Sequence, residues 1–289
     1  MKLKSSLLKT LTMIALCLFI NACNNSTEPS DETTGVIIDH NDTDLSLLKT
    51  ESITKARESL HIAYGHTSHG SQLISGMQGL TAMKGSAYAF NHGGSEDCLD
   101  LRDRPFSGAN DLGNPNRTQW AASTRTYLAA NPDINVIIWS WCGQVSSATE
   151  ADIETYLDLM NGLENDYPGV KFVYMTGHLD GSGEDGNLHK RNEQIRRYCV
   201  DNQKVLYDFA DIESYDPSGE VNYMLLNADD ACNYDSDGDG SRDANWATAW
   251  QQSHTENVDW FSCGSAHSQP LNANLKAYAA WALWTKLAE

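Results

Sequence analysis

The chain has 289 residues, a formal net charge of −19 at pH 7 and 40% hydrophobic residues, which is enough apolar material for one large folded domain. So acidic a chain is a poor partner for nucleic acid or for an anionic membrane surface. None of its seven cysteines forms a CxxC pair or a Cys/His spacing that is typical of structural zinc.

Residues 1–22 have the pattern of an export signal, in which three lysines precede a short apolar run at 11–20. Because the segment ends at a cysteine, it resembles a bacterial lipoprotein signal. That implies lipid attachment at Cys23 and a membrane anchor in the cell envelope. The alternative is an ordinary signal peptide with an incidental cysteine. Cleavage would leave 289 − 22 = 267 residues with a charge of −19 − 3 = −22, of which 23–57 read as a polar tether and lead-in.

From residue 58 onward, short apolar runs alternate with amphipathic stretches. The run at 135–139 is β-branched and lacks polar alternation, as in strands that are covered on both faces. Residues 92–117, rich in Gly, Asn, Asp and Pro, read as a long loop. The predicted strands are 60–64, 135–139, 171–175 and 205–209, and the predicted helices are 72–80, 118–130, 150–165, 187–200 and 272–287.

This alternation predicts parallel strands joined by right-handed crossovers, and hence a three-layer α/β/α sandwich over residues 58–289. In such sheets ligands bind at the carboxyl ends of the strands. Unusual polar sequences follow all four predicted strands, namely GHTSHGS at 65–71, SWCGQ at 140–144, TGHLDG at 176–181 and ADIESYD at 210–216. We therefore expect the functional site at this edge of the sheet.

The turn at 65–71 contains two serines directly before a predicted helix. There the first backbone N–H groups of the helix favour a developing oxyanion. Ser68 or Ser71 could therefore be a nucleophile, or could simply cap the helix. A nucleophilic serine needs a base, and His267, in a loop before the last predicted helix, is a candidate general base.

The order of these segments resembles that of the SGNH/GDSL hydrolases. The resemblance rests on the strand–Gly–Ser segment, on PDINVIIWSWCGQ (132–144), on YPGVKFVYMTG (167–177) and on a histidine before the last helix. It covers about residues 58–288. It implies a flavodoxin-like, mainly parallel sheet and a serine ester hydrolase that works through an acyl-enzyme.

The same resemblance implies roles for individual residues. Ser68 would be the nucleophile, with Ser71 in reserve, because GHTS is similar to the GHxS form of the family's first motif. His267 would be the base. Residue 264 is glycine where the family has aspartate, so Glu256, Asp259 or a backbone carbonyl would orient His267.

The oxyanion hole implied by the resemblance combines the Ser68 N–H with a glycine N–H, from Gly113 or alternatively Gly108. Gln144 stands near the position of the family's asparagine and offers the same amide chemistry.

The histidines leave zinc open as an alternative. His66 and His69 are three residues apart, and His178 and His254 could join them. A zinc-bound water would then be the nucleophile of a metal-dependent hydrolase.

A calcium loop is predicted in DSDGDGSRD at residues 235–243. Acidic residues stand at positions 1, 3, 5 and 9 of the motif, and Gly240 at position 6 permits the bend. The calcium would be structural and would fix an insertion around 227–246; the alternative is a solvated acidic loop. The ligands would be Asp235, Asp237, Asp239, the Ser241 carbonyl and Asp243.

Together these features predict an exported, lipid-anchored serine hydrolase that removes acetyl or other short acyl groups from carbohydrates or small esters. Tryptophans at 120, 139, 141, 246, 250 and 260 could stack on sugars or lie in the core. The rival interpretation is a non-catalytic, calcium-dependent carbohydrate-binding protein of the cell surface with the same fold.

Overall fold

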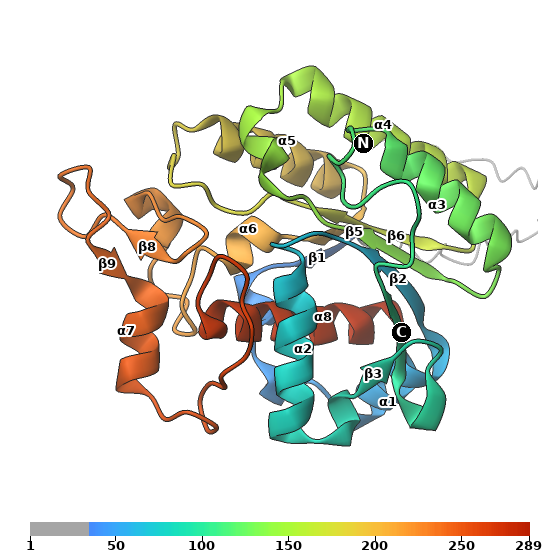
Figure 1. Ribbon diagram of the computed structural model, residues 1–289, viewed down its shortest axis with the longest axis horizontal. Helices are drawn as coiled ribbons and strands as arrows, with labels where there is room; N and C mark the ends of the chain where they lie inside the picture. Colours follow the sequence, from blue (N-terminus) through green and yellow to red (C-terminus); the bar gives the residue numbers. More distant parts are fainter. Residues whose placement is uncertain (1–34) are drawn as a thin grey trace, which may run out of the picture. The chain divides into compact units, whose positions relative to one another are not determined.

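A computed structural model describes residues 35–289 (Figure 1). The predicted export signal, the lipidation site at Cys23 and the first part of the tether lie outside the described residues. Within residues 35–289, no helix combines the length and the apolarity that crossing a bilayer requires.

The core of the fold is a sheet of seven parallel strands in the order β1-β7-β6-β5-β2-β4-β3. All four residues of β5 are buried, as expected for a strand that is covered on both faces. The strands are β1 (Val36–Ile38), β2 (His61–Gly65), β3 (Phe90–Asn91), β4 (Leu99–Asp103), β5 (Val136–Trp139), β6 (Lys171–Met175) and β7 (Val205–Tyr207).

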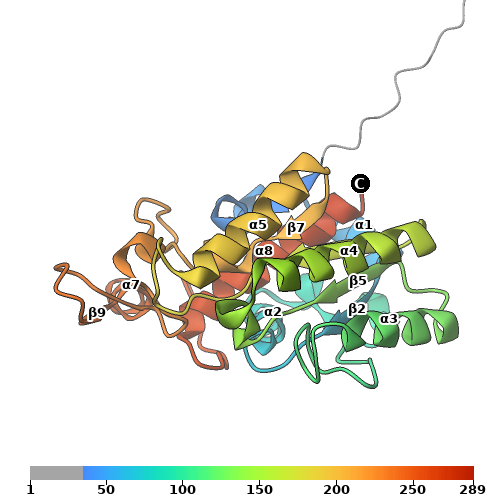
Figure 2. The ribbon, with the colours of Figure 1, turned by 90° about the horizontal axis from the view of Figure 1, so that it is seen from above.

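Helices cover both faces of the sheet, so the predicted three-layer α/β/α sandwich is confirmed (Figure 1 and Figure 2). The sheet has a hydrophobic core on each face, and neighbouring residues of a strand point into different cores. Ile138 packs with one helix layer and Ile137 with the other. One layer holds α1 (Thr50–Ser59), α2 (Ser71–Lys84) and α8 (Pro270–Leu287), and the other holds α3 (Gln119–Ala130), α4 (Glu150–Asp166) and α5 (Asn187–Asp201).

The helix α4 shows how local sequence sets an element. Thr149 Oγ1 accepts from the N–H of Asp152 at 3.1 Å, and Asp152 Oδ2 accepts from the N–H of Thr149 at 2.8 Å. This capping box begins the helix at Glu150. The apolar face of the predicted helix is buried, namely Ile153, Tyr156, Leu157, Met160 and Leu163.

The segment 92–117, whose composition predicts a loop, contains the interior strand β4. Its sequence, LDLRD, has no continuous apolar run. Asp100 and Arg102 can nevertheless be buried in the sheet because they form an ion pair, with 2.9 Å between Asp100 Oδ2 and Arg102 Nη2. Hydropathy alone therefore misses this strand.

Two further segments differ from the prediction. The predicted polar lead-in, which ends at residue 57, contains β1 and most of α1, and β1 pairs with β7 at the edge of the sheet. The predicted strand at 205–209 ends at Tyr207, because the Asp208 side chain accepts from the N–H of Asp211 at 3.1 Å and caps α6 (Phe209–Ile212).

The topology places a ligand-binding edge between β2 and β5. The strands β4, β2, β5, β6 and β7 follow the 2-1-3-4-5 order of flavodoxin-like sheets, with the switch point between β2 and β5. The turn after β2 and the loop after β5 therefore meet at the carboxyl edge, where such sheets bind ligands.

The helices α2 and α8 approach each other closely at Gly76, where a Cβ would lie only 2.0 Å from the Ala273 carbonyl oxygen. The turn that carries Ser68 leads directly into α2, and the loop that carries His267 leads into α8. Their packing therefore fixes these two loops relative to each other. The segment between α6 and α8 holds the antiparallel pair β8 (Asn233–Tyr234) and β9 (Ala244–Asn245), followed by α7 (Trp246–Ser253).

Candidate active site

The turn between β2 and α2 is held by its own side chains. Ser71 Oγ donates to the Ser68 carbonyl at 2.6 Å, so the hydroxyl of the predicted reserve nucleophile is used within the turn. Gly70 is required because a Cβ there would lie 2.3 Å from Ser140 Oγ and 2.5 Å from His66 Cβ. The tight turn brings Ser68 and His69 against the loop that follows β5.

A buried carboxylate, Asp111, joins the loops around this turn. It accepts from Thr67 Oγ1 at 2.6 Å, from the Gly113 N–H at 2.8 Å and from Gln144 Nε2 at 3.1 Å. Gln144 Oε1 in turn accepts from the Cys142 N–H at 2.9 Å. The two predicted oxyanion-hole residues, Gly113 and Gln144, are thus neighbours, but in this arrangement their donors hold the loops together and position Cys142.

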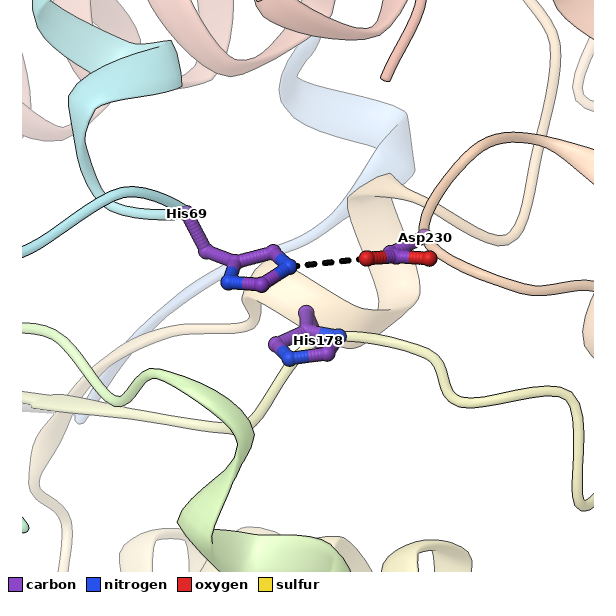
Figure 3. A group of neighbouring side chains, drawn as sticks. All are labelled: His69, His178 and Asp230. Carbon is purple, nitrogen blue, oxygen red and sulfur yellow. Dashed lines mark hydrogen bonds and ion pairs between the residues drawn. The ribbon is translucent and has the colours of Figure 1, made fainter. Parts of the chain in front are cut away.

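His69 connects a thiol to a carboxylate, and Figure 3 shows the bond to the carboxylate of Asp230. His69 Nε2 lies 2.8 Å from Asp230 Oδ2, and His69 Nδ1 lies 3.4 Å from Cys142 Sγ. The three residues come from the turn after β2, the loop after β5 and the segment between α6 and β8. A nucleophile, a base and an acid that orients the base make up the arrangement of catalytic triads.

These contacts set the charges of the group. Burial opposes protonation of His69, but the hydrogen bonds to Asp230 and Cys142 outweigh it and raise its pKa to about 9. The hydrogen bond from His69 lowers the pKa of the Cys142 thiol, which burial raises; the Ser68 and Thr67 hydroxyls lower it further, to about 6. Burial also raises the pKa of Asp230, but the bond from His69 brings it below its ordinary value. The two shifts act in the same direction and favour a thiolate beside an imidazolium near neutral pH.

A second histidine, His178, stacks on His69 with the ring centroids 3.6 Å apart and the planes inclined by 7° (Figure 3). Its Nδ1 donates to the Leu179 carbonyl at 2.7 Å, which leaves Nε2 as the acceptor nitrogen. Burial, and then the charge of His69, lower the pKa of His178 to about 4. Within residues 35–289, its buried Nε2 has no hydrogen-bond partner.

His69, His178 and Asp230 also offer donor atoms within 4.8 Å of one another, which is the strongest case for a metal. However, a metal lies in the plane of each imidazole that coordinates it, about 2.0–2.1 Å from the nitrogen. The lone pairs of two nearly parallel rings do not converge on one ion. The arrangement therefore suits proton transfer better than zinc ligation.

The other two histidines of the zinc alternative lie elsewhere. His66 Nε2 bonds Asp103 Oδ1 at 2.6 Å, and the His254 ring stacks on Trp250 with centroids 3.7 Å apart. Neither belongs to the group around His69.

Ser68 and His267, the predicted nucleophile and base, both reach this edge of the sheet. Ser68 Oγ lies 3.6 Å from Cys142 Sγ, and the exposed His267 ring stacks on His69 with centroids 4.6 Å apart. Within residues 35–289, no hydrogen bond joins Ser68 to His267, and no carboxylate bonds His267. Asp259, a predicted orienting acid, instead accepts from the Thr255 N–H at 2.9 Å.

Most of the tryptophans considered for sugar stacking belong to the core. Trp120, Trp139, Trp141 and Trp246 are no more than 2% exposed. Trp250 and Trp260 keep partial exposure.

The predicted calcium loop brings three of its acids together. Donor oxygens of Asp235, Asp237 and Asp239 lie within 4.8 Å of one another. Asp235 accepts from the N–H groups of Gly238 and Gly240 at 2.8 Å each, whereas Asp243 accepts from Ser236 instead. The loop thus has the compact turn and the acidic donors that suit calcium, with Asp243 outside the group.

Sequence reasoning gave no catalytic role to His69, Cys142 or Asp230, and it named His69 only as a possible zinc ligand. The first two stand in polar sequences that follow predicted strands, and that position was their signal. Asp230 lies 161 residues from His69 along the chain, and no local pattern marks it.

Neither the protein-family models nor the curated proteins contain a match to this sequence.

Proposed function

We propose that this chain is an exported hydrolase that cleaves acyl esters through a covalent acyl-enzyme at the carboxyl edge of β2 and β5. The proposal rests on the position of His69 between the Asp230 carboxylate and the Ser68–Cys142 pair. An acid, a base and a nucleophile in contact are the requirement for covalent acyl transfer.

His69 is the base in this proposal, and Asp230 orients it. Both His69 and His267 lie at the site, but only His69 bonds a carboxylate among the described residues. An imidazole held in this way takes the proton of the nucleophile and gives it to the leaving alcohol, whether that first transfer precedes the attack, as with a thiol, or accompanies it, as in serine triads.

The substrate class follows from the resemblance to the SGNH/GDSL hydrolases. Acetyl or other short acyl groups on carbohydrates fit a protein that carries an export signal and a lipid anchor at Cys23. The anchor itself would hold the enzyme in the cell envelope.

The test is hydrolysis of p-nitrophenyl acetate and of acetylated xylo-oligosaccharides by the purified mature chain, with p-nitrophenol and acetate measured. His69→Ala and Asp230→Asn should each lower kcat/KM by about 10²–10⁴-fold, the range of a general base. His254→Ala is the matched control, because His254 stacks on Trp250 away from the site. All variants should unfold at nearly the same temperature.

Three outcomes would contradict the proposal. Wild-type rates in His69→Ala would remove the assigned base. Activity that a chelator abolishes and zinc restores would favour the metal-dependent alternative. Absence of hydrolysis, together with sugar binding that requires calcium and survives His69→Ala, would favour the non-catalytic binding protein.

A further inference from the structure

We propose that Cys142, rather than Ser68, is the nucleophile of this site, and that it acts as a thiolate held by His69 and Asp230. The inference rests on the proposed hydrolase function and names its reacting atom. It departs from the serine chemistry that the family resemblance implies.

The contacts of the two candidate nucleophiles differ. Cys142 Sγ lies 3.4 Å from His69 Nδ1, within hydrogen-bonding distance for sulfur. Ser68 Oγ forms no hydrogen bond with an imidazole or a carboxylate among residues 35–289; its hydrogen-bond partner is Cys142 Sγ at 3.6 Å. A serine hydroxyl without a base is a weak nucleophile. Ser68 is better placed to donate a hydrogen bond to the thiolate.

The surroundings of Cys142 suit a reacting group. The Gln144 side chain holds its backbone N–H at 2.9 Å, which fixes the loop. The backbone N–H groups of Ser68 and His69 make no hydrogen bond within residues 35–289 and are available to an oxyanion. A Cβ on Gly143 would lie 3.8 Å from His178 Nε2, so this unpartnered buried acceptor faces the residue next to the thiol.

The reaction balances with water as the only co-substrate. The thiolate attacks the ester carbonyl and forms a C–S bond. As the C–O bond breaks, the Nδ1 proton of the His69 imidazolium moves to the departing alkoxide, which leaves as the alcohol. Neutral His69 then takes a proton from water, whose oxygen attacks the thioester. The C–S bond breaks, the carboxylic acid leaves, and the thiolate–imidazolium pair is restored.

Another cysteine of the chain provides an internal control. Cys263 is also half-buried, but its neighbours are Asn274 Nδ2 at 3.4 Å and the Pro270 carbonyl at 3.8 Å. Burial raises the pKa of its thiol to about 11. Cys263 should therefore react slowly at a pH where Cys142 reacts fast.

The first arm of the test does not depend on turnover. The intact mature chain is alkylated with iodoacetamide at pH 4.5–9, and modification at each cysteine is quantified by mass spectrometry. Cys142 should reach half its maximal rate near pH 6 and at pH 6.5 react at least tenfold faster than Cys263. Asp230→Asn should move that midpoint upward by at least one pH unit. A midpoint near 8.5 in the wild type, the value of a free thiol, would overturn the thiolate.

The second arm identifies the nucleophile. Cys142→Ala should abolish ester hydrolysis, Ser68→Ala should lower it about tenfold, and Cys263→Ser should leave it unchanged. Rapid acid quench should trap an acyl group on Cys142 that hydroxylamine removes. If Cys142→Ala stays active while a fluorophosphonate labels Ser68, this inference fails and the hydrolase proposal stands. If no ester is hydrolysed but Cys142 alkylates with a midpoint near pH 6, the hydrolase proposal fails and the thiolate is supported.

Discussion

Substitution of Gly76 by alanine should separate the helices α2 and α8, which directly follow the loops that carry Ser68 and His267. The added Cβ would lie 2.0 Å from the Ala273 carbonyl oxygen, whereas ordinary contact begins at 3.4 Å, so α2 and α8 must part by about 3.4 − 2.0 = 1.4 Å. The obstacle is backbone, so no side-chain rotation relieves it. Overpacking of this kind costs about 1–3 kcal/mol.

The helical preference of alanine over glycine, about 1 kcal/mol, opposes this cost. At the upper end of the overpacking range, the net loss is about 2 kcal/mol. That corresponds to a fall in Tm of about 4–8 °C for a domain of this size. A displacement of about 1 Å at α2 also moves His69 relative to Cys142, so kcat/KM should fall by as much as about a hundredfold.

The matched control is Gly162→Ala in α4, where the nearest atom to the new Cβ would be Arg125 Nη2 at an ordinary 3.7 Å. Here only the helical preference acts, and the Tm should rise by about 2–4 °C. Thermal unfolding followed by circular dichroism, with ester hydrolysis measured beside it, compares the two variants. Equal stabilisation by both substitutions would refute the close packing of α2 on α8.

Three further predictions concern charge, metal and export. The Glu213 carboxyl is fully buried and lies 3.0 Å from Lys276 Nζ. Lys276→Met removes this cation and should lower the free energy of unfolding, measured in urea at pH 8, by about 3–5 kcal/mol. Burial raises the pKa of Glu213, and below that pKa the carboxyl is neutral. The loss of stability in Lys276→Met should therefore be smaller at pH 5 than at pH 8. An equal loss at both pH values would exclude a buried charge. Calcium should raise the Tm of the wild type but not that of Asp237→Ala. If neither calcium nor a chelator changes the Tm of the wild type, the calcium proposal is wrong. Cys23→Ser should move the protein from the membrane fraction to the soluble fraction, and unchanged fractionation would reject the lipid anchor.

Local patterns were enough to predict much of the fold. The run at 171–175 matches β6 residue for residue, and the apolar face of α4 is buried as its periodicity predicts. Both features depend only on residues that lie close to one another in the sequence. The rule that parallel sheets bind ligands at their carboxyl ends then placed Ser68, His69 and Cys142 at one edge before any contact was known.

The layered α/β architecture, and with it the sheet edge proposed for the site, could therefore be predicted from the chain alone, because hydrophobic periodicity and the alternation of strands with helices are local properties. Tertiary structure alone decided the strand β4, whose buried Asp100 and Arg102 pair with each other and with polar groups from neighbouring segments, among them His61 and Asp133. It also decided the chemistry of the site. Asp230 reaches His69 across 161 residues of chain and raises the pKa of its imidazole, and His69 in turn lowers the pKa of the Cys142 thiol. Such pairings follow from the packing of distant segments, which no short sequence pattern specifies.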